Sequence, residues 1–193
     1  MWWIVACASQ PEPVAAPPAV VVSDPAADAA RIAEVERSLP RLAVSLRDRL
    51  SAAIAEGGPA AGVSACSLDA AAITAAFGAE HGVSAGRSSL RLRNPANVGP
   101  DWVRAWLTEQ GERSAAGVTG VSRVVEADGA RVVQILKPIV VEPGCLLCHG
   151  PADALVPDVK AALAASYPTD AATGYAAGDL RGALWVEAPL VRP

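Results

Sequence analysis

The clearest chemical pattern in the sequence is residues 145–149, which read Cys-Leu-Leu-Cys-His. This C-x-x-C-H spacing is typical of a covalent attachment site for haem c. Two thiols three positions apart can each form a thioether with one vinyl group of the same porphyrin, and the imidazole that follows can bind the iron as its proximal ligand. Gly144 and Gly150 flank the motif and leave the backbone free to bend around a flat macrocycle. The motif therefore predicts one haem c bound through Cys145 and Cys148, with His149 on the iron.

Three other interpretations fit the same five residues. A redox-active dithiol is expected in a βαβ context, whereas a strand-rich stretch precedes this motif. A zinc site could use Cys66, Cys145, Cys148 and His149 as a Cys3His set, which would make the chain a zinc-stabilised structural or binding domain without redox activity. The third is a chance match in a loop. Haem and zinc are easily separated, because a haem protein is red and covalent haem survives denaturation.

Composition sets limits on the function. A chain of 193 residues has room for one domain with a proper core. With 16 basic and 20 acidic residues the net charge is −4, which gives no electrostatic support to nucleic-acid binding. Aromatic residues make up 4% of the chain, so the predicted core is aliphatic, and a bulky apolar cofactor would add to it. No paired-carboxylate, Ser/His or phosphate-loop arrangement stands out, and we therefore do not expect an enzyme.

The N-terminus predicts export. Residues 1–7 are apolar and end in Ile-Val-Ala-Cys, which resembles the lipobox at which bacterial lipoproteins are lipidated on cysteine, here Cys7. The stretch has no basic n-region and is shorter than a normal signal, so either it is a truncated signal or Cys7 is incidental, and we favour the truncated signal. Residues 8–28 are rich in Pro and Ala and predict a disordered tether, followed by a single domain over 29–193. We therefore expect a periplasmic protein, anchored to a membrane by the lipid on Cys7.

Helices are expected in the first half of the domain. An apolar stripe at three- and four-residue steps predicts one long amphipathic helix from Ile32 to Ile54, with Pro40 kinking it or beginning a second helix. Gly57-Gly58-Pro59 should end that helix. A second helix is predicted over residues 59–81, with Cys66 on its apolar face and Gly82 as its C-cap.

Strands dominate the second half. Residues 117–127 and 130–141 are β-branched runs that flank Asp128-Gly129, a strong hairpin signal. Pro138 should therefore lie at an edge or a strand end. We expect short helices over 101–110, with Asp101 as N-cap, and over 153–166, and a final strand over 182–189. Helices followed by an antiparallel sheet make this an α+β fold.

Haem iron usually takes a second axial ligand, and few candidates are present. The only methionine is Met1, and the only histidine besides His149 is His81. Cys66 is the third candidate, although a free cysteine is by default a small buried apolar residue. Spacing alone leaves His81 and Cys66 both open.

Residues 86–97 read Gly-Arg-Ser-Ser-Leu-Arg-Leu-Arg-Asn-Pro-Ala-Asn. The pattern predicts a basic strand that ends in an Asn-Pro turn. Its arginines, Arg87, Arg91 and Arg93, could pair with haem propionates, although such a row often only covers a solvent face.

The same segment resembles the hallmark of a bacterial family of exported haem-c-binding domains with a PAS-like fold, long filed as a domain of unknown function. The resemblance continues at residues 136–139, 145–150, 167–168 and 174–182, in the family's order, and covers about residues 60–186. It implies a PAS-like antiparallel sheet with flanking helices and one covalent haem c. In that family a cysteine about one helix before the basic segment is a haem ligand. Cys66 occupies that place, so the resemblance favours Cys66 over His81 as the sixth ligand.

These features predict a monohaem c-type protein that works as a redox or gas sensor, or as an electron-transfer module, outside the cytoplasm. Thiolate donates strongly to ferric iron, which predicts a low reduction potential. On reduction the Cys66 thiolate could be protonated and leave, opening a coordination site for a small gas. The sequence carries no kinase, cyclase or DNA-binding segment, so a signal or electron would pass to a separate protein partner, still unknown.

Overall fold

The structure is a computed structural model and describes residues 24–112, 114–127 and 129–191. Within these residues, one antiparallel sheet has four strands in the order β1-β4-β3-β2. The strands are β1 Ser84–Ser88, β2 Val121–Ala127, β3 Ala130–Val140 and β4 Leu180–Pro189. The α-helices are α1 Pro25–Leu68, α2 Ala70–His81, α3 Asp101–Gln110, α4 Leu146–His149 and α5 Pro157–Ser166. Two short 3-10 helices, η1 Pro95–Asn97 and η2 Pro143–Cys145, complete the described elements.

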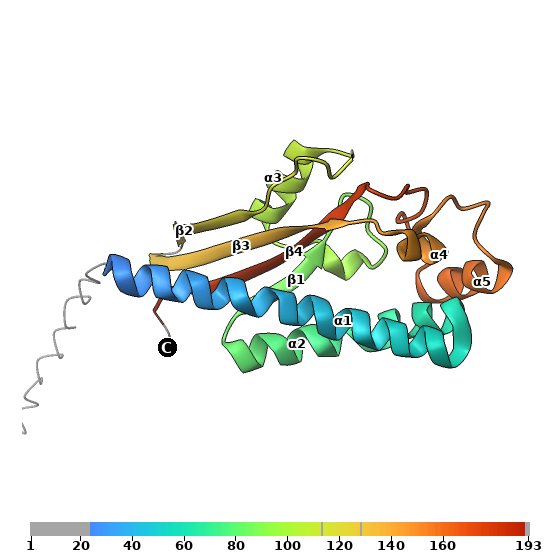
Figure 1. Cartoon of the computed structure of the whole chain (residues 1–193), viewed down its shortest axis with the longest axis horizontal. Helices are drawn as coiled ribbons and strands as arrows, with labels where there is room; N and C mark the ends of the chain where they lie inside the picture. The colour runs from blue at the N-terminus through green and yellow to red at the C-terminus, as the bar shows by residue number, and fades with distance from the viewer. Residues whose placement is uncertain (1–23, 113, 128, 192–193) are drawn as a thin grey trace, which may run out of the picture.

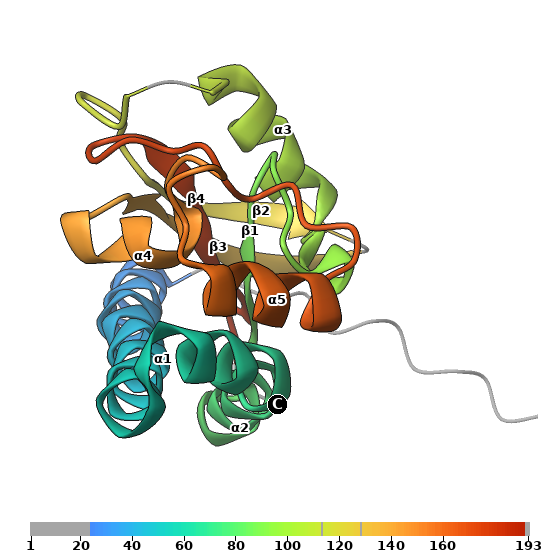
Figure 2. The same ribbon diagram turned by 90° about the vertical axis from the view of Figure 1, so that its right-hand side faces the viewer.

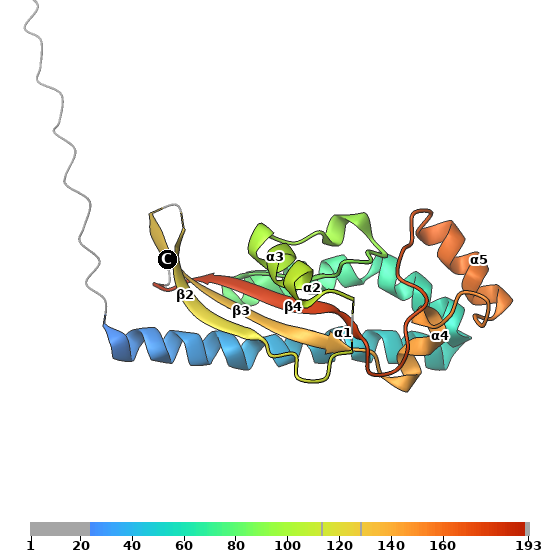
Figure 3. The ribbon, with the colours of Figure 1, turned by 90° about the horizontal axis from the view of Figure 1, so that it is seen from above.

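Helices cover both faces of the sheet. α1 and α2 lie along one face and α3 lies against the other, while α4 and α5 gather at one end (Figures 1 and 2). Seen from above, α1 follows the strands for their full length and continues past them to α5 (Figure 3). The α+β, PAS-like architecture expected from the sequence, with its long N-terminal helix, is confirmed.

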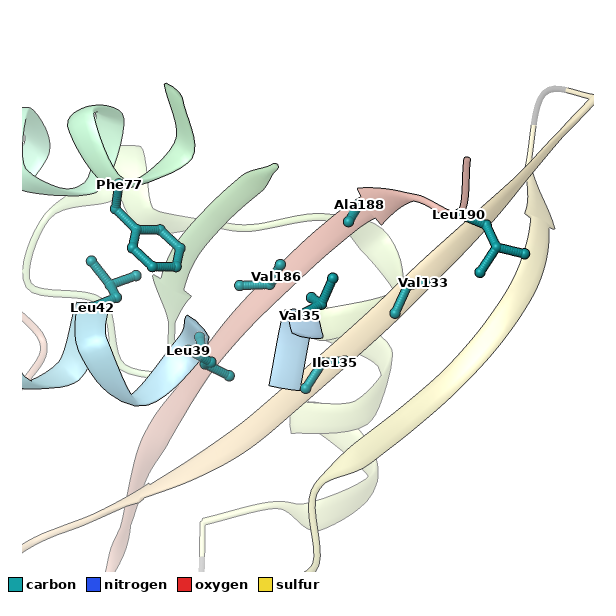
Figure 4. Packing of buried hydrophobic residues seen from close by; sticks show 9 residues of the cluster. All are labelled: Val35, Leu39, Leu42, Phe77, Val133, Ile135, Val186, Ala188 and Leu190. Carbon is teal, nitrogen blue, oxygen red and sulfur yellow. The ribbon is translucent and has the colours of Figure 1, made fainter. Parts of the chain in front are cut away.

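The strand period of two explains how one sheet can pack on both sides. Ile135 belongs to the core under α1 and α2, and its neighbour Leu136 belongs to the core under α3. The first core is aliphatic apart from one aromatic ring, that of Phe77 (Figure 4). Its members are Val35, Leu39, Leu42, Phe77, Val133, Ile135, Val186, Ala188 and Leu190.

α1 begins inside the segment predicted as a tether. The side chain of Asp24 caps the helix by accepting a hydrogen bond from the backbone N–H of Ala26 at 2.9 Å, and Pro25 takes the first helical position. Residues 25–28 are therefore helical, and Asp28 pairs with Arg131 of β3 at 2.6 Å. The predicted lipobox with Cys7 and the rest of the predicted tether lie outside the described residues.

The helical region over residues 25–81 is interrupted at two places, of which the sequence predicted one. Helical backbone angles continue through Pro40, which is exposed, so no second helix begins there. Gly57 and Gly58 interrupt the helix as expected, with non-helical angles that include φ +74° at Gly58. The predicted helix over 59–81 is two pieces, because the chain bends by 47° between α1 and α2, at Asp69. Of the described helices, none alone is long and apolar enough to span a membrane, whereas α1 and α2 together pass that test of length and composition.

The predicted hairpin is present as β2 and β3, paired from Val121 with Leu136 to Ala127 with Ala130. Asp128, in its turn, lies outside the described residues. Pro138 lies beyond the last β2 pair and has a partner only on the β4 side, Ala183. The expectation that this proline lies where one side of the strand is open is therefore confirmed.

Several element boundaries differ from the predictions, including the final strand, which begins at Leu180 and not at residue 182. The basic strand ends at Ser88, because the arginines that follow bind the loop at residues 170–175 instead of continuing the sheet. α3 has Pro100 as its N-cap, because the Pro100 carbonyl accepts from the backbone N–H groups of Val103 and Arg104. The later helix is shorter than 153–166 and starts at Pro157.

Candidate cofactor site

A cavity of about 720 Å³ lies where the end of α1, α2, β1 and α4 meet. This volume is within the roughly 300–1,000 Å³ of typical cofactor and ligand pockets. Its lining joins residues that are far apart in the sequence. The potentially reactive or charged side chains among them are Cys66, Arg87, Arg93, Cys145, Cys148, His149, Tyr167 and Arg181.

The C-x-x-C-H motif forms a tight turn at the edge of this cavity. Cys145 ends η2, and Cys148 and His149 lie on α4. The two cysteines are free thiols and half-buried. A Cβ at Gly150 would lie 2.7 Å from the backbone oxygen of Leu146, so only glycine fits there. Gly144 has nothing within 4 Å of its Cβ position, and the turn does not require glycine on that side.

His149 is held as a neutral imidazole. Its Nδ1 lies 2.7 Å from the backbone oxygen of Ala172. Because a carbonyl only accepts, Nδ1 carries the proton and Nε2 keeps its lone pair, the arrangement usual for a metal-binding histidine. Burial first, and then the nearby charges of Arg181 and Arg93, lower the pKa of His149 to about 3. The side chain is thus in the form that binds iron at neutral pH.

Cys66 lines the same cavity from the last part of α1. Burial raises the pKa of its thiol, while the positive charges of Arg87, Arg93 and Arg49 act in the opposite direction. The structure therefore places the predicted sixth ligand and the predicted fifth ligand on one cavity.

His81, the other candidate for the sixth ligand, does not line this cavity. Its ring packs on Phe77 with 4.6 Å between centroids, and Nε2 lies 3.8 Å from Glu80. It borders a separate recess of about 270 Å³, next to Arg31 and Arg41. The two candidates that spacing left open are therefore separated by the fold.

The three arginines predicted to contact the haem propionates have different surroundings in the structure. Arg91 donates to the backbone oxygen of Thr173 at 2.8 Å and lies 3.7 Å from the centre of the Tyr175 ring, outside the cavity lining. Arg93 lines the cavity but forms a buried ion pair with Asp170. Arg87 lines the cavity, and its side chain makes no hydrogen bond or ion pair with any described residue. Of these three arginines, only Arg87 therefore has its guanidinium available for a cofactor carboxylate.

Two cavity residues were not identified from the sequence. Arg181 Nε and Trp185 Nε1 are buried and have no partner among the described residues. Arg181 Nη1 donates to the Ser89 hydroxyl at 2.6 Å. In the sequence, the only indication that Arg181 belongs to the site is its place in the glycine-rich segment at 174–182.

The residues present fit a haem c and not a zinc ion. Two thiols at the correct spacing, a neutral imidazole with Nδ1 fixed, and buried unpaired donors all face one largely apolar space. Within the described ranges, no three His, Cys, Asp or Glu side chains are close enough together to hold a metal ion. The Cys3His site of the zinc alternative is therefore not assembled.

Comparison with known proteins agrees with the fold. No curated protein matches the chain. The crystal structure of the cyanobacterial heme-protein Tll0287 has a TM-score of 0.59 at 19% identity, over 83% of this chain and 98% of that one. At that identity the likeness establishes a shared fold. The model of the Tll0287-like family matches residues 21–189, which confirms the family resemblance seen in the sequence motifs. The chain belongs to the Tll0287-like family.

Proposed function

We propose that this protein binds one haem c, covalently through Cys145 and Cys148, with His149 and Cys66 as axial ligands. The observation that carries the proposal is the single cavity on which all four side chains lie, although Cys66 is far from the motif in sequence. A solved protein of the same fold is described as a heme-protein.

Each residue has a separate task in this proposal. The two thiols would hold the cofactor covalently, and His149 Nε2 and the Cys66 thiolate would bind its iron. Bound haem supplies one-electron redox chemistry and, with an axial position open, binding of a small gas. Cys66 is the ligand we expect to exchange, because its segment lies between the breaks at Gly57–Gly58 and at Asp69 and packs through Val63 in the cluster of α5, outside the core of the sheet.

The biological role that fits this ligand set is a redox or gas sensor, or an electron-transfer module, and not an enzyme. Thiolate favours ferric iron and a low reduction potential. We place the protein in the periplasm, because covalent haem attachment at C-x-x-C-H is consistent with the export signal expected around Cys7. An unidentified redox or signalling protein would receive the electron or the signal.

A pyridine haemochrome assay on protein exported from cells with a haem c maturation system tests the proposal. We expect one haem per chain that stays attached after denaturation, and a thiolate-type ferric spectrum before it. A colourless protein that contains zinc would refute the proposal.

A further inference from the structure

The loop at residues 170–175 is bound to the C-x-x-C-H turn along its length. The backbone N–H of Tyr175 donates to the His149 oxygen at 3.0 Å, and that of Gly174 donates to the Gly150 oxygen at 2.7 Å. The Ala172 oxygen accepts from His149 Nδ1 at 2.7 Å. This loop therefore sets the orientation of the imidazole.

Arg93 and Asp170 hold the backbone of the same residue, Ala172. Arg93 Nη2 donates to the Ala172 oxygen at 3.2 Å and to the Cys148 oxygen at 2.6 Å. Arg93 Nε lies 3.2 Å from each carboxylate oxygen of Asp170, and that carboxylate accepts from the Ala172 N–H at 2.8 Å. Both polar backbone groups of Ala172 are thus held by one ion pair.

The ion pair is itself protected from water. The exposed fractions of the two side chains are 11% for Arg93 and 10% for Asp170, so solvent and salt screen the interaction little. Arg93 uses Nε for the carboxylate and Nη2 for the two carbonyls, and the single nitrogen of an ammonium cannot reproduce this planar spread of donors. The Nε and Nη2 donors of Arg93 are therefore already used within the protein and are not available to bind a haem propionate.

We infer that Arg93 and Asp170 are positioning residues that hold His149 through the Ala172 carbonyl and raise the reduction potential of the bound haem. The inference rests on the proposed function. Because Arg93 and His149 donate to the same oxygen, each hydrogen bond is weaker than it would be alone, and the imidazole keeps less anionic character. A less basic imidazole and a nearby positive charge both favour ferrous iron.

Spectroelectrochemical titration of the haem-loaded full chain tests this inference in three variants. Arg93→Gln removes both the charge and the shared hydrogen bond. Arg93→Lys keeps the charge and loses the fork geometry, and it serves as the second variant if Arg93→Gln does not fold. Arg87→Gln is the matched control, because Arg87 faces the same cavity and also lowers the pKa of His149, but makes no contact with Ala172.

We expect Arg93→Gln to shift the one-electron equilibrium towards ferric iron at least tenfold further than Arg87→Gln, which corresponds to about 59 mV. Arg93→Lys should also shift it towards ferric iron. A wild-type potential in Arg93→Lys, or equal shifts in Arg93→Gln and Arg87→Gln, would mean that charge alone acts and would overturn the inference. A wild-type chain without covalent haem overturns the proposed function, and this inference with it.

Discussion

At the scale of single residues, the four proposed haem contacts differ in how replaceable they are. The Cys145 and Cys148 thiols form covalent bonds in the proposed complex, whereas Cys66 contributes only a coordination bond from another element. His149 is fixed by its hydrogen bond to Ala172 at 2.7 Å, and Cys66 has no comparable restraint among the described contacts. Loss of Cys66 should therefore change the electronic state of the iron without releasing the haem.

Cys66→Ala is expected to keep one covalent haem per chain and to lose the thiolate-type ferric spectrum. The pyridine haemochrome assay measures the first quantity, and the absorption spectrum of the folded ferric protein measures the second. His81→Ala is the control, because His81 borders a different recess and should leave the spectrum unchanged. If His81→Ala changes the spectrum and Cys66→Ala does not, the assignment of the sixth ligand is wrong.

Residues that act through their side chains were easier to predict than residues that act through the backbone. The C-x-x-C-H motif is contiguous, so its chemistry is visible in the sequence. Ala172 works through a carbonyl that every residue has, and its partner Asp170 is 77 positions from Arg93. No pattern could connect them before the chain was folded, and the sequence accordingly suggested propionates as partners of Arg93.

At the scale of elements, the turn formed by η2 and α4 depends on one glycine. The Cβ position of Gly150 lies 2.7 Å from the backbone oxygen of Leu146, and a backbone atom cannot move aside cheaply. Gly144, on the other flank, meets nothing within 4 Å. The two glycines look equivalent in the sequence, where both were expected to relieve the turn, and only their surroundings distinguish them.

Gly150→Ala should distort the turn and lower the free energy of unfolding by about 1–3 kcal/mol, the usual cost of adding a methyl group where the space is already filled. It should also reduce the fraction of chains with covalent haem, because the two thiols and the imidazole are held by this turn. Urea unfolding and the haemochrome yield measure the two effects. Gly144→Ala is the matched control and should behave as the wild type; an equal loss in both variants would contradict the argument.

Helix boundaries could be predicted only where a local signal decides them. The glycine pair at 57–58 and the C-cap at Gly82 lie where the sequence put them. The break at Asp69 has no glycine or proline, and it separates Cys66 from α2 although an apolar stripe runs through both. Asp69 instead pairs with Arg49, 20 residues earlier, at 2.7 Å. The spacing of apolar residues carries no information about a tertiary contact of this kind, so the break at Asp69 could not be predicted from it.

At the scale of the whole molecule, α1 has two parts with different tasks. Its first part covers the sheet with Val35, Leu39 and Leu42, and its last part lines the cavity with Cys66. The sheet joins the two regions, since β4 contributes Val186 to the first core and Arg181 to the cavity. The stability of the fold and the chemistry of the site therefore lie at opposite ends of the same helix and strand.

This separation predicts that a core substitution far from the cavity lowers stability without altering the site. Leu39 is fully buried between α1 and the sheet, and Leu39→Ala leaves a cavity there. The expected loss is about 2–5 kcal/mol of unfolding free energy, a large part of the roughly 5–15 kcal/mol typical of a domain. Urea unfolding should show that loss while the ferric spectrum of the folded fraction stays that of the wild type.

Val44→Ala is the matched control, on the same helix but with 46% of its surface exposed, and it should change the free energy of unfolding by no more than about 0.5 kcal/mol. A changed haem spectrum in Leu39→Ala would show instead that the two parts of α1 are coupled, and that the covering of the sheet helps to set the position of Cys66.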